Sequence, residues 1–117
     1  AGTFFLPRLI GFGKASAIAM LADKISAQQA EQMGMIYKAV STDEFSAFAK
    51  ATTLKLSKLP TVALANTKKA LNAAMTNNLE QQLQLESDLQ IESSQTEDYS
   101  EGVAAFMDKR APEFKGK

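Results

Sequence analysis

Signals that begin and end helices recur along this chain and favour a helical fold. Ser26 and Gln29 have the spacing of a capping box, in which each side chain binds the other residue's backbone N–H group at the start of a helix. They predict a short helix over 27–33. Gly34 follows it and can adopt the left-handed conformation that commonly ends a helix.

A longer helix is predicted to follow. Ser41 and Glu44 form a second capping box, and the helix should run to about Lys58. Pro60 ends it because proline has no backbone N–H group and disfavours helical geometry in the preceding residue. The apolar positions recur every three or four residues and predict one buried face: Phe45, Phe48, Ala49, Thr52, Leu56 and Leu59.

Two more helical segments complete this pattern. Thr61 can cap a helix whose predicted buried side is Leu64, Leu71 and Met75, and 77–78 interrupt it. Thr96 begins a last helix, which should end at 111–112. Its predicted apolar side consists of Tyr99, Val103, Phe106 and Met107.

The segment between these two helices is apolar on more than one side. Its large apolar residues are Leu83, Leu85, Leu89 and Ile91. Leu83 and Leu85 point to nearly opposite sides of a helix, so one face cannot bury both. Such a helix is either central in its own domain or shared with a second polypeptide.

Residues 35–40 supply the one candidate strand. They form a β-favouring run with no helical periodicity, so we expect a short extended segment there. The predicted fold class is therefore all-α, with at most one short strand near 35–40.

Composition excludes several classes of function. The 117 residues contain no Cys and no His, which excludes disulfides, thiol catalysis, His-dependent triads and the usual zinc sites. Thirteen basic and thirteen acidic residues give zero net charge, which argues against binding to nucleic acid. No apolar run has the length of a membrane span. We expect a cytoplasmic protein.

The charges are unevenly distributed along the chain. Residues 1–78 carry nine basic and four acidic residues, whereas 79–117 carry four basic and nine acidic ones. This asymmetry fits docking of the acidic part on a basic one, an anionic ligand on the basic part, or solvated faces without a partner.

No local motif assembles a catalytic site. Residues 11–16 lack the spacing of a phosphate-binding loop and favour a glycine-rich joint between two helices. The acidic residues of 80–101 favour a solvated helix face over paired carboxylates for acid–base chemistry. Lys68–Lys69 and Lys109–Arg110 favour ordinary surface charge over phosphate binding.

Several segments, in order and at matching spacing, resemble the later half of the enoyl-CoA hydratase/isomerase (crotonase) family. They are 1–11, 17–21, 23–30, Gly34, Lys69, Glu86 and 101–117. The Phe-Phe-Leu-Pro-Arg run is most similar to the branch that contains the epoxyphenylacetyl-CoA isomerases of phenylacetate breakdown.

The resemblance implies an enzyme acting on acyl-CoA thioesters by oxyanion-stabilised proton transfer. The backbone amides of the family's oxyanion hole and the carboxylate that moves the proton in this branch belong to an earlier part of the family's chain. We therefore assign no catalytic residue and no metal. We expect the 117 residues to be a C-terminal fragment that is inactive alone, with the missing N-terminal half as its partner. No cofactor is implied, because coenzyme A is part of the substrate.

The resemblance also implies substrate-binding residues. Thr3, Phe4 and Phe5 would lie at the acyl pocket, although both phenylalanines could equally be core residues. Lys109 matches a family lysine that reaches the CoA nucleotide, commonly one bound to a neighbouring subunit, and Phe106 packs close by. Gln90 stands where the family has an aromatic residue that contacts adenine.

Two interpretations follow for the chain as a whole. In the first, residues 1–40 end the crotonase core and residues 41–117 form a C-terminal helical oligomerisation region, which in this family builds homo-trimers or hexamers. In the alternative, the chain is a stand-alone helical module that self-associates without catalytic activity. The acyl group, and hydration against isomerisation, stay open.

Overall fold

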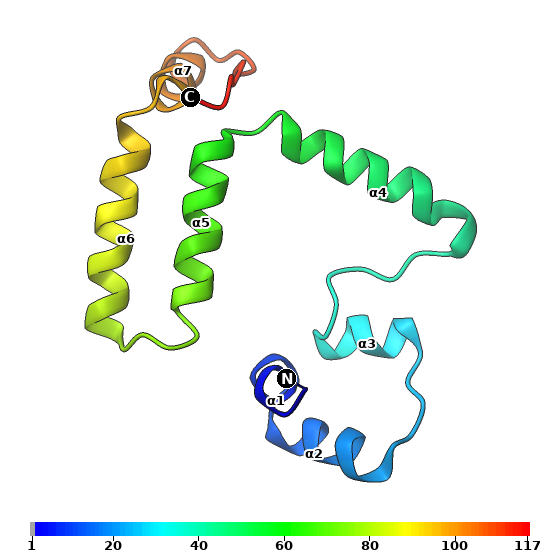
Figure 1. Ribbon diagram of the computed structural model, residues 1–117. Helices are drawn as coiled ribbons and strands as arrows, with labels where there is room; N and C mark the ends of the chain where they lie inside the picture. The colour runs from blue at the N-terminus through cyan, green and yellow to red at the C-terminus, as the bar shows by residue number, and fades with distance from the viewer. Residues whose placement is uncertain (1) are drawn as a thin grey trace. The chain divides into compact units, whose positions relative to one another are not determined.

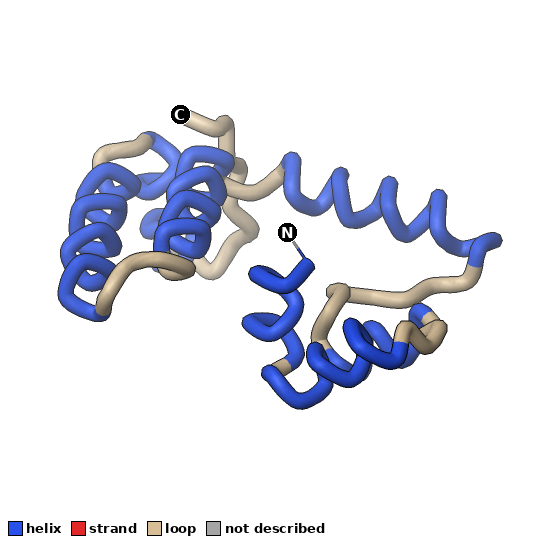
Figure 2. Tube along the Cα trace, turned by 60° about the horizontal axis from the view of Figure 1, so that its bottom comes forward, coloured by secondary structure: helices blue, strands red, loops and turns tan. Residues whose placement is uncertain are grey.

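Residues 2–117, the part that the computed structural model describes, form seven α-helices and no strand (Figures 1 and 2). The all-α class predicted from the sequence is confirmed. None of these helices has the length and hydrophobicity of a membrane-spanning segment. The helices are α1 (Gly2–Ile10), α2 (Phe12–Leu21), α3 (Ala27–Met33), α4 (Thr42–Ser57), α5 (Thr61–Ala73), α6 (Leu79–Ser94) and α7 (Glu97–Met107).

The chain divides into two compact units, and the division falls within α4, between Phe48 and Ala49. In the first unit α1 packs against α2, with Ile10 and Ala15 buried. Gly11 joins the two helices at φ 82°, a left-handed conformation that glycine adopts without strain. The prediction of a glycine-rich joint in place of a phosphate loop is therefore correct.

Helix α3 has the bounds and the caps that its sequence predicts. The Ser26 hydroxyl accepts from the Gln29 N–H at 3.1 Å, and the Gln29 side chain accepts from the Ser26 N–H at 2.8 Å. Gly34 ends the helix at φ 82°. These contacts span three residues or fewer, so the local sequence is enough to specify them.

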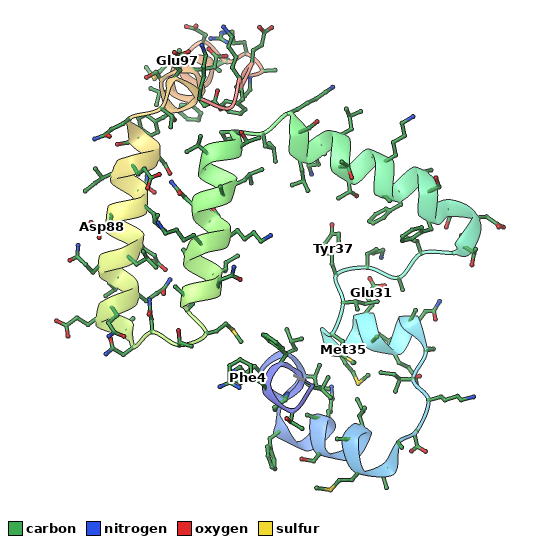
Figure 3. All side chains as sticks on the ribbon, viewed as in Figure 1. Phe4, Glu31, Met35, Tyr37, Asp88 and Glu97 are labelled. Carbon is green, nitrogen blue, oxygen red and sulfur yellow. The ribbon has the colours of Figure 1, made fainter. Side chains whose placement is uncertain are left out.

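The candidate strand over 35–40 does not form, because residues 35–37 make a bend and residues 38–40 a loop. Their polar groups bind to α3: the Glu31 carboxylate accepts from Lys38 Nζ at 2.9 Å and from the Ala39 N–H at 3.0 Å. The ring of Tyr37, labelled in Figure 3, stacks on an aromatic ring of α4. No neighbouring strand is present in residues 2–117 to pair with the segment, and an isolated strand is not stable.

In the second unit α5 and α6 run side by side in opposite directions, and α7 packs against α6 (Figure 1). Leu89 and Ala105 are buried, and so is Asn66, whose side-chain amide donates to the Ser93 hydroxyl at 3.1 Å. Pro60, not Thr61, is the residue that precedes α5, and no side chain caps that helix. The prediction of a Thr61 cap is therefore wrong.

Many apolar residues predicted to be buried are exposed. They are Phe45 and Leu56 in α4, Leu71 and Met75 in or after α5, and Tyr99, Val103, Phe106 and Met107 in α7. The periodicity identifies an apolar side of these helices, but within residues 2–117 these side chains keep 37–82% of their surface exposed. Helix α7 also ends at Met107, earlier than the 111–112 predicted.

Candidate functional site

An open groove of about 790 Å³ lies among α5, α6 and α7 in the second unit. Its apolar lining includes Leu71, Leu89, Tyr99, Val103, Phe106 and Phe114. A polar row runs along α6 at a spacing of four residues, through Gln82, Glu86 and Gln90. Gln82 links α6 to α5, because its amide nitrogen lies 3.2 Å from both the Ala70 carbonyl of α5 and the Glu86 carboxylate of α6. The groove therefore offers a mainly apolar surface with one polar edge.

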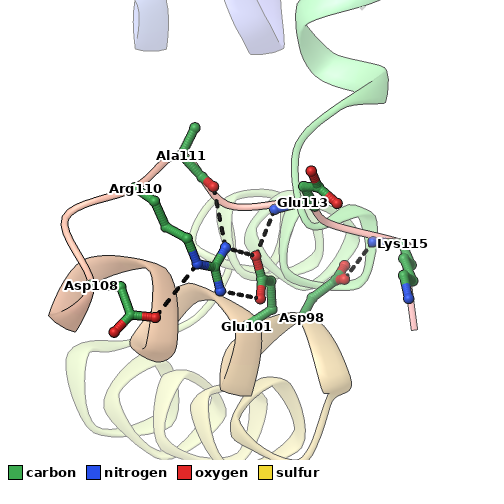
Figure 4. Close-up of polar contacts among 7 residues, drawn as sticks. All are labelled: Asp98, Glu101, Asp108, Arg110, Ala111, Glu113 and Lys115. Atoms are coloured by element: carbon green, nitrogen blue, oxygen red, sulfur yellow. Dashed lines mark hydrogen bonds and ion pairs between the residues drawn. The ribbon is translucent and has the colours of Figure 1, made fainter.

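Beside this groove, an ion pair fastens the chain that follows α7. Arg110 donates from both terminal nitrogens to the two oxygens of Glu101, at 2.6 and 2.9 Å (Figure 4). The Glu113 N–H also donates to Glu101 at 2.8 Å. The Arg110 hydrogen bonds, and then that N–H, lower the pKa of Glu101 to about 2. We call this arrangement the tail clamp.

A second carboxylate on α7 holds the last residues of the chain. Asp98, 2% exposed, accepts from the Lys115 N–H at 2.6 Å and from the Gly116 N–H at 2.8 Å. Its own N–H donates to the Lys117 carbonyl at 3.0 Å. The expectation that the acidic residues of 80–101 form a solvated face is therefore wrong for Asp98 and Glu101, because both bind backbone N–H groups of the tail.

Two predicted site residues, Phe106 and Lys109, lie together at the end of α7. Lys109 has a left-handed backbone at φ 55°, and its N–H donates to the Phe106 carbonyl at 3.3 Å. The Phe106 side chain is 82% exposed and lines the groove. Lys109 is also exposed, and its side chain makes no hydrogen bond or ion pair within residues 2–117.

The other three predicted residues, Thr3, Phe4 and Phe5, lie in the first turns of α1 and are exposed. The rings of Phe4 and Phe5 meet edge to face, with their centroids 5.1 Å apart. The Arg8 guanidinium lies 3.7 Å from the centre of the Phe4 ring and donates to the Phe4 carbonyl at 2.8 Å. Both rings are on the surface of the first unit, so within the described residues neither is core. This group belongs to the first unit, whereas Phe106 and Lys109 belong to the second.

Reasoning from the sequence missed the residues that fix the chain after α7. The local sequence predicts exposed charges at Asp98, Glu101 and Arg110, because the partners of these residues lie between nine and eighteen residues away. The one available signal is that Asp98 and Glu101 are three residues apart, which places both on one side of α7. That spacing is common on solvated helices and does not identify a clamp.

Comparisons with known proteins match the whole chain to one family. The enoyl-CoA hydratase/isomerase family matches residues 1–117. The chain is 42% identical over 116 residues to the "Probable enoyl-CoA hydratase" of Rhodobacter capsulatus and 41% identical to the 1,2-epoxyphenylacetyl-CoA isomerase of Escherichia coli. A crystal structure of an enoyl-CoA hydratase subunit from Geobacillus kaustophilus superposes with a TM-score of 0.94 at 33% identity.

These matches cover nearly all of this chain but less than half of each relative. They include 99% of the chain in each case, against 45% of the Rhodobacter protein, 44% of the Escherichia protein and 45% of the Geobacillus chain. The matched portion of the solved structures is their C-terminal part. By sequence over its whole length and by the arrangement of its helices, this chain belongs to the enoyl-CoA hydratase/isomerase family.

Proposed function

We propose that this chain supplies the C-terminal part of an acyl-CoA hydratase or isomerase, where it binds the nucleotide portion of the CoA thioester and takes part in subunit assembly. The complete enzyme would act by oxyanion-stabilised proton transfer next to the thioester carbonyl. The observation that carries this proposal is the exposed pair formed by Phe106 and Lys109 at the end of α7, in a chain that belongs to the family throughout its length.

The chemistry of this pair suits a nucleoside phosphate. An exposed aromatic ring can stack on a base, and an ammonium group three residues away can contact a phosphate as a point charge. Gln90 lines the same groove as Phe106, so an amide is available there in place of the family's adenine-contacting aromatic residue. Phe106 would then supply most of the stacking surface.

Helix α1 would form one wall of the acyl pocket. Phe4 and Phe5 present exposed ring surface next to Thr3, and the contact between Arg8 and Phe4 fixes one of the two rings. One relative at 41% identity is an isomerase of an aromatic acyl-CoA, 1,2-epoxyphenylacetyl-CoA. Aromatic rings in the pocket wall fit an aromatic or short unsaturated acyl group.

The remaining exposed apolar residues support the assembly part of the proposal. We assign 1–40 to the end of the enzyme core and 41–117 to a helical oligomerisation region of a homo-trimer or hexamer. The apolar residues of α4, and Leu83 and Ile91 on α6, are exposed within the chain and are available to such partners. A stand-alone module without catalytic activity would use the same surfaces but would bind no CoA.

The decisive experiment is titration calorimetry of coenzyme A on the protein at its full natural length. Lys109→Ala should raise the Kd about fivefold, or roughly 1 kcal/mol, the scale of one charge-assisted contact partly exposed to water. Lys115→Ala, which removes an exposed lysine from the same tail, is the matched control and should leave the Kd unchanged. Equal dissociation constants for Lys109→Ala and wild type would remove Lys109 from the site.

An activity assay separates the two halves of the proposal. The full-length protein should turn over an enoyl-CoA or an epoxide of phenylacetyl-CoA. The isolated 117 residues should turn over neither, because the resemblance implies that the family's oxyanion hole lies in an earlier part of the family's chain, and this chain spans only 45% and 44% of two relatives. Measurable turnover by the isolated chain would contradict the proposal that catalysis requires the rest of the full-length protein.

A further inference from the structure

Helices α3 and α7 end with the same backbone motif but use different residues in it. After α3, the N–H groups of Gly34 and Met35 donate to the last turn at 3.0 and 2.9 Å. After α7, the N–H groups of Lys109 and Arg110 do the same at 3.3 and 3.0 Å. In both motifs the first residue is left-handed, with φ 82° at Gly34 and φ 55° at Lys109.

Lysine is an unfavourable residue at this position. A Cβ atom in the left-handed region approaches the backbone, and glycine avoids that cost, which is why glycine is the usual residue there. Ala22, the other non-glycine residue with positive φ in residues 2–117, ends α2 with one backbone hydrogen bond to Ile18. At Lys109 the chain carries the same cost, but in addition both neighbouring residues are held by side-chain contacts.

These side-chain contacts involve the residues immediately before and after Lys109 in the sequence. Arg110, immediately after it, forms the tail clamp with Glu101. Asp108, immediately before it, lies with a carboxylate oxygen 3.6 Å from the Arg110 Nε atom. The Glu113 N–H adds a third donor to Glu101, so the chain on the far side of Arg110 is fastened too. The backbone at Lys109 is thereby fixed from both sides.

The same contacts determine which cation is available to a ligand. The Arg110 charge is matched by Glu101 and Asp108, and its two terminal nitrogens are already bound. Lys109 retains an exposed ammonium group with no partner among the described residues, and its backbone N–H binds the carbonyl of Phe106, whose ring is also exposed. Of two adjacent basic residues, one is therefore structural and the other is free to bind an anion.

We infer that Glu101 and Arg110 are positioning residues, which hold Lys109 in its left-handed conformation so that its ammonium group meets a phosphate of the bound nucleotide. This inference rests on the proposed function, because it takes coenzyme A as the ligand. It adds that the lysine is retained at a position where glycine would give a more stable protein. Lys109 therefore lowers the stability of the folded protein relative to glycine but supplies the group that binds the ligand.

The test is a double-mutant cycle on the full-length protein, with free coenzyme A as the probe. Lys109→Gly should raise the melting temperature and weaken CoA binding about fivefold. Glu101→Gln should weaken binding severalfold and raise KM more than it lowers kcat. In the Lys109→Gly background, Glu101→Gln should have no further effect on the Kd, because its action passes through the lysine.

Two further variants guard against a purely structural explanation. Arg110→Lys keeps the charge but loses the paired hydrogen bonds, and should reproduce the effect of Glu101→Gln on binding. Glu97→Gln removes an exposed ion pair with Lys117 from the same helix and should leave the Kd unchanged. It is the matched control for loss of a carboxylate from α7.

The outcomes separate the inference from the function on which it rests. If the wild-type protein binds no CoA, the proposed function fails and the inference fails with it. If the wild type binds CoA but Glu101→Gln weakens binding equally in both backgrounds, the positioning role alone is overturned. A Lys109→Gly protein that binds CoA as tightly as wild type, or that melts at a lower temperature, also overturns the inference alone.

Discussion

Two glycines, one in α7 and one in the C-terminal tail, differ in how strictly the structure requires glycine at their positions. Gly102 lies inside α7, and a Cβ atom there would sit 3.5 Å from the Phe114 ring, an ordinary contact. Gly116 has φ 76°, and a Cβ atom there would sit 2.6 Å from the Thr61 hydroxyl oxygen. The first glycine leaves a space that a methyl group can fill, whereas the second is required by both its backbone and its neighbour.

Opposite stability changes are therefore expected from the same substitution. Gly102→Ala should stabilise the second unit by about 0.5–1 kcal/mol, because alanine is the better helix former. Gly116→Ala should destabilise it by about 1–3 kcal/mol through backbone strain and the close contact with Thr61. Urea unfolding of both variants checks this. A Gly116→Ala protein as stable as wild type would mean that the end of the tail is not packed on α5.

At the scale of elements, a helix in each unit uses a glutamate to hold the loop that follows it. Glu31 in α3 binds Lys38 and the Ala39 N–H group, and Glu101 in α7 binds Arg110 and the Glu113 N–H group. The same two kinds of partner lower the pKa of both carboxyls. Each glutamate thereby fixes a segment that has no regular structure of its own.

The tail clamp predicts a specific acid sensitivity of α7 and its tail. The pKa of Glu101 is about 2 in the folded protein, against its usual 4.5 when unfolded. Its stabilising contribution is complete above pH 4.5 and is lost as the pH falls from about 4.5 to about 2. Glu101→Gln should be less stable than wild type at neutral pH, and the two melting curves should converge near pH 2. Melting temperatures that differ equally at pH 7 and pH 2 would contradict the clamp.

Helix starts and ends could be predicted from the sequence where their contacts are local. The caps of α3 and the glycine joint before α2 involve residues within a few positions of one another, and both are correct. The loop at 35–40 could not be predicted, because its conformation depends on Glu31 and on the absence of a neighbouring strand. The binding of Asp98 to backbone N–H groups seventeen and eighteen residues later could not be predicted either, because its spacing to Glu101 is common on solvated helices.

For the molecule as a whole, the pattern of burial is the main departure from the sequence prediction. Helices α4, α5 and α7 have the apolar periodicity of buried elements, yet among residues 2–117 the buried apolar side chains are few, and three of the five are alanines. They are Ile10, Ala15, Ala30, Leu89 and Ala105. Periodicity reports that a face is to be covered but not which polypeptide covers it. This is why the candidate site residues could be named from the resemblance, while the packing around them could not.

The different exposure of two leucines on α6 leads to a prediction about assembly. Leu83 is 57% exposed and shares a shallow surface patch with Leu79, whereas Leu89 is 5% exposed inside the second unit. Asp88, labelled in Figure 3, is also exposed, so this helix presents both apolar and acidic groups outside the unit. The sequence leaves open whether the apolar residues of this helix are central in their own domain or shared with a second polypeptide. The burial of Leu89 assigns that residue to folding of the second unit.

Leu83→Asp in the full-length protein should lower the oligomeric state while the helical circular dichroism is retained, because a charge on the exposed patch opposes burial between subunits. Leu89→Asp should instead destabilise the fold itself, by on the order of 3–5 kcal/mol, because it buries an unpaired charge. Sedimentation velocity and thermal melts distinguish the two effects. If the Leu83→Asp protein sediments like wild type, α6 does not form a subunit contact at this patch.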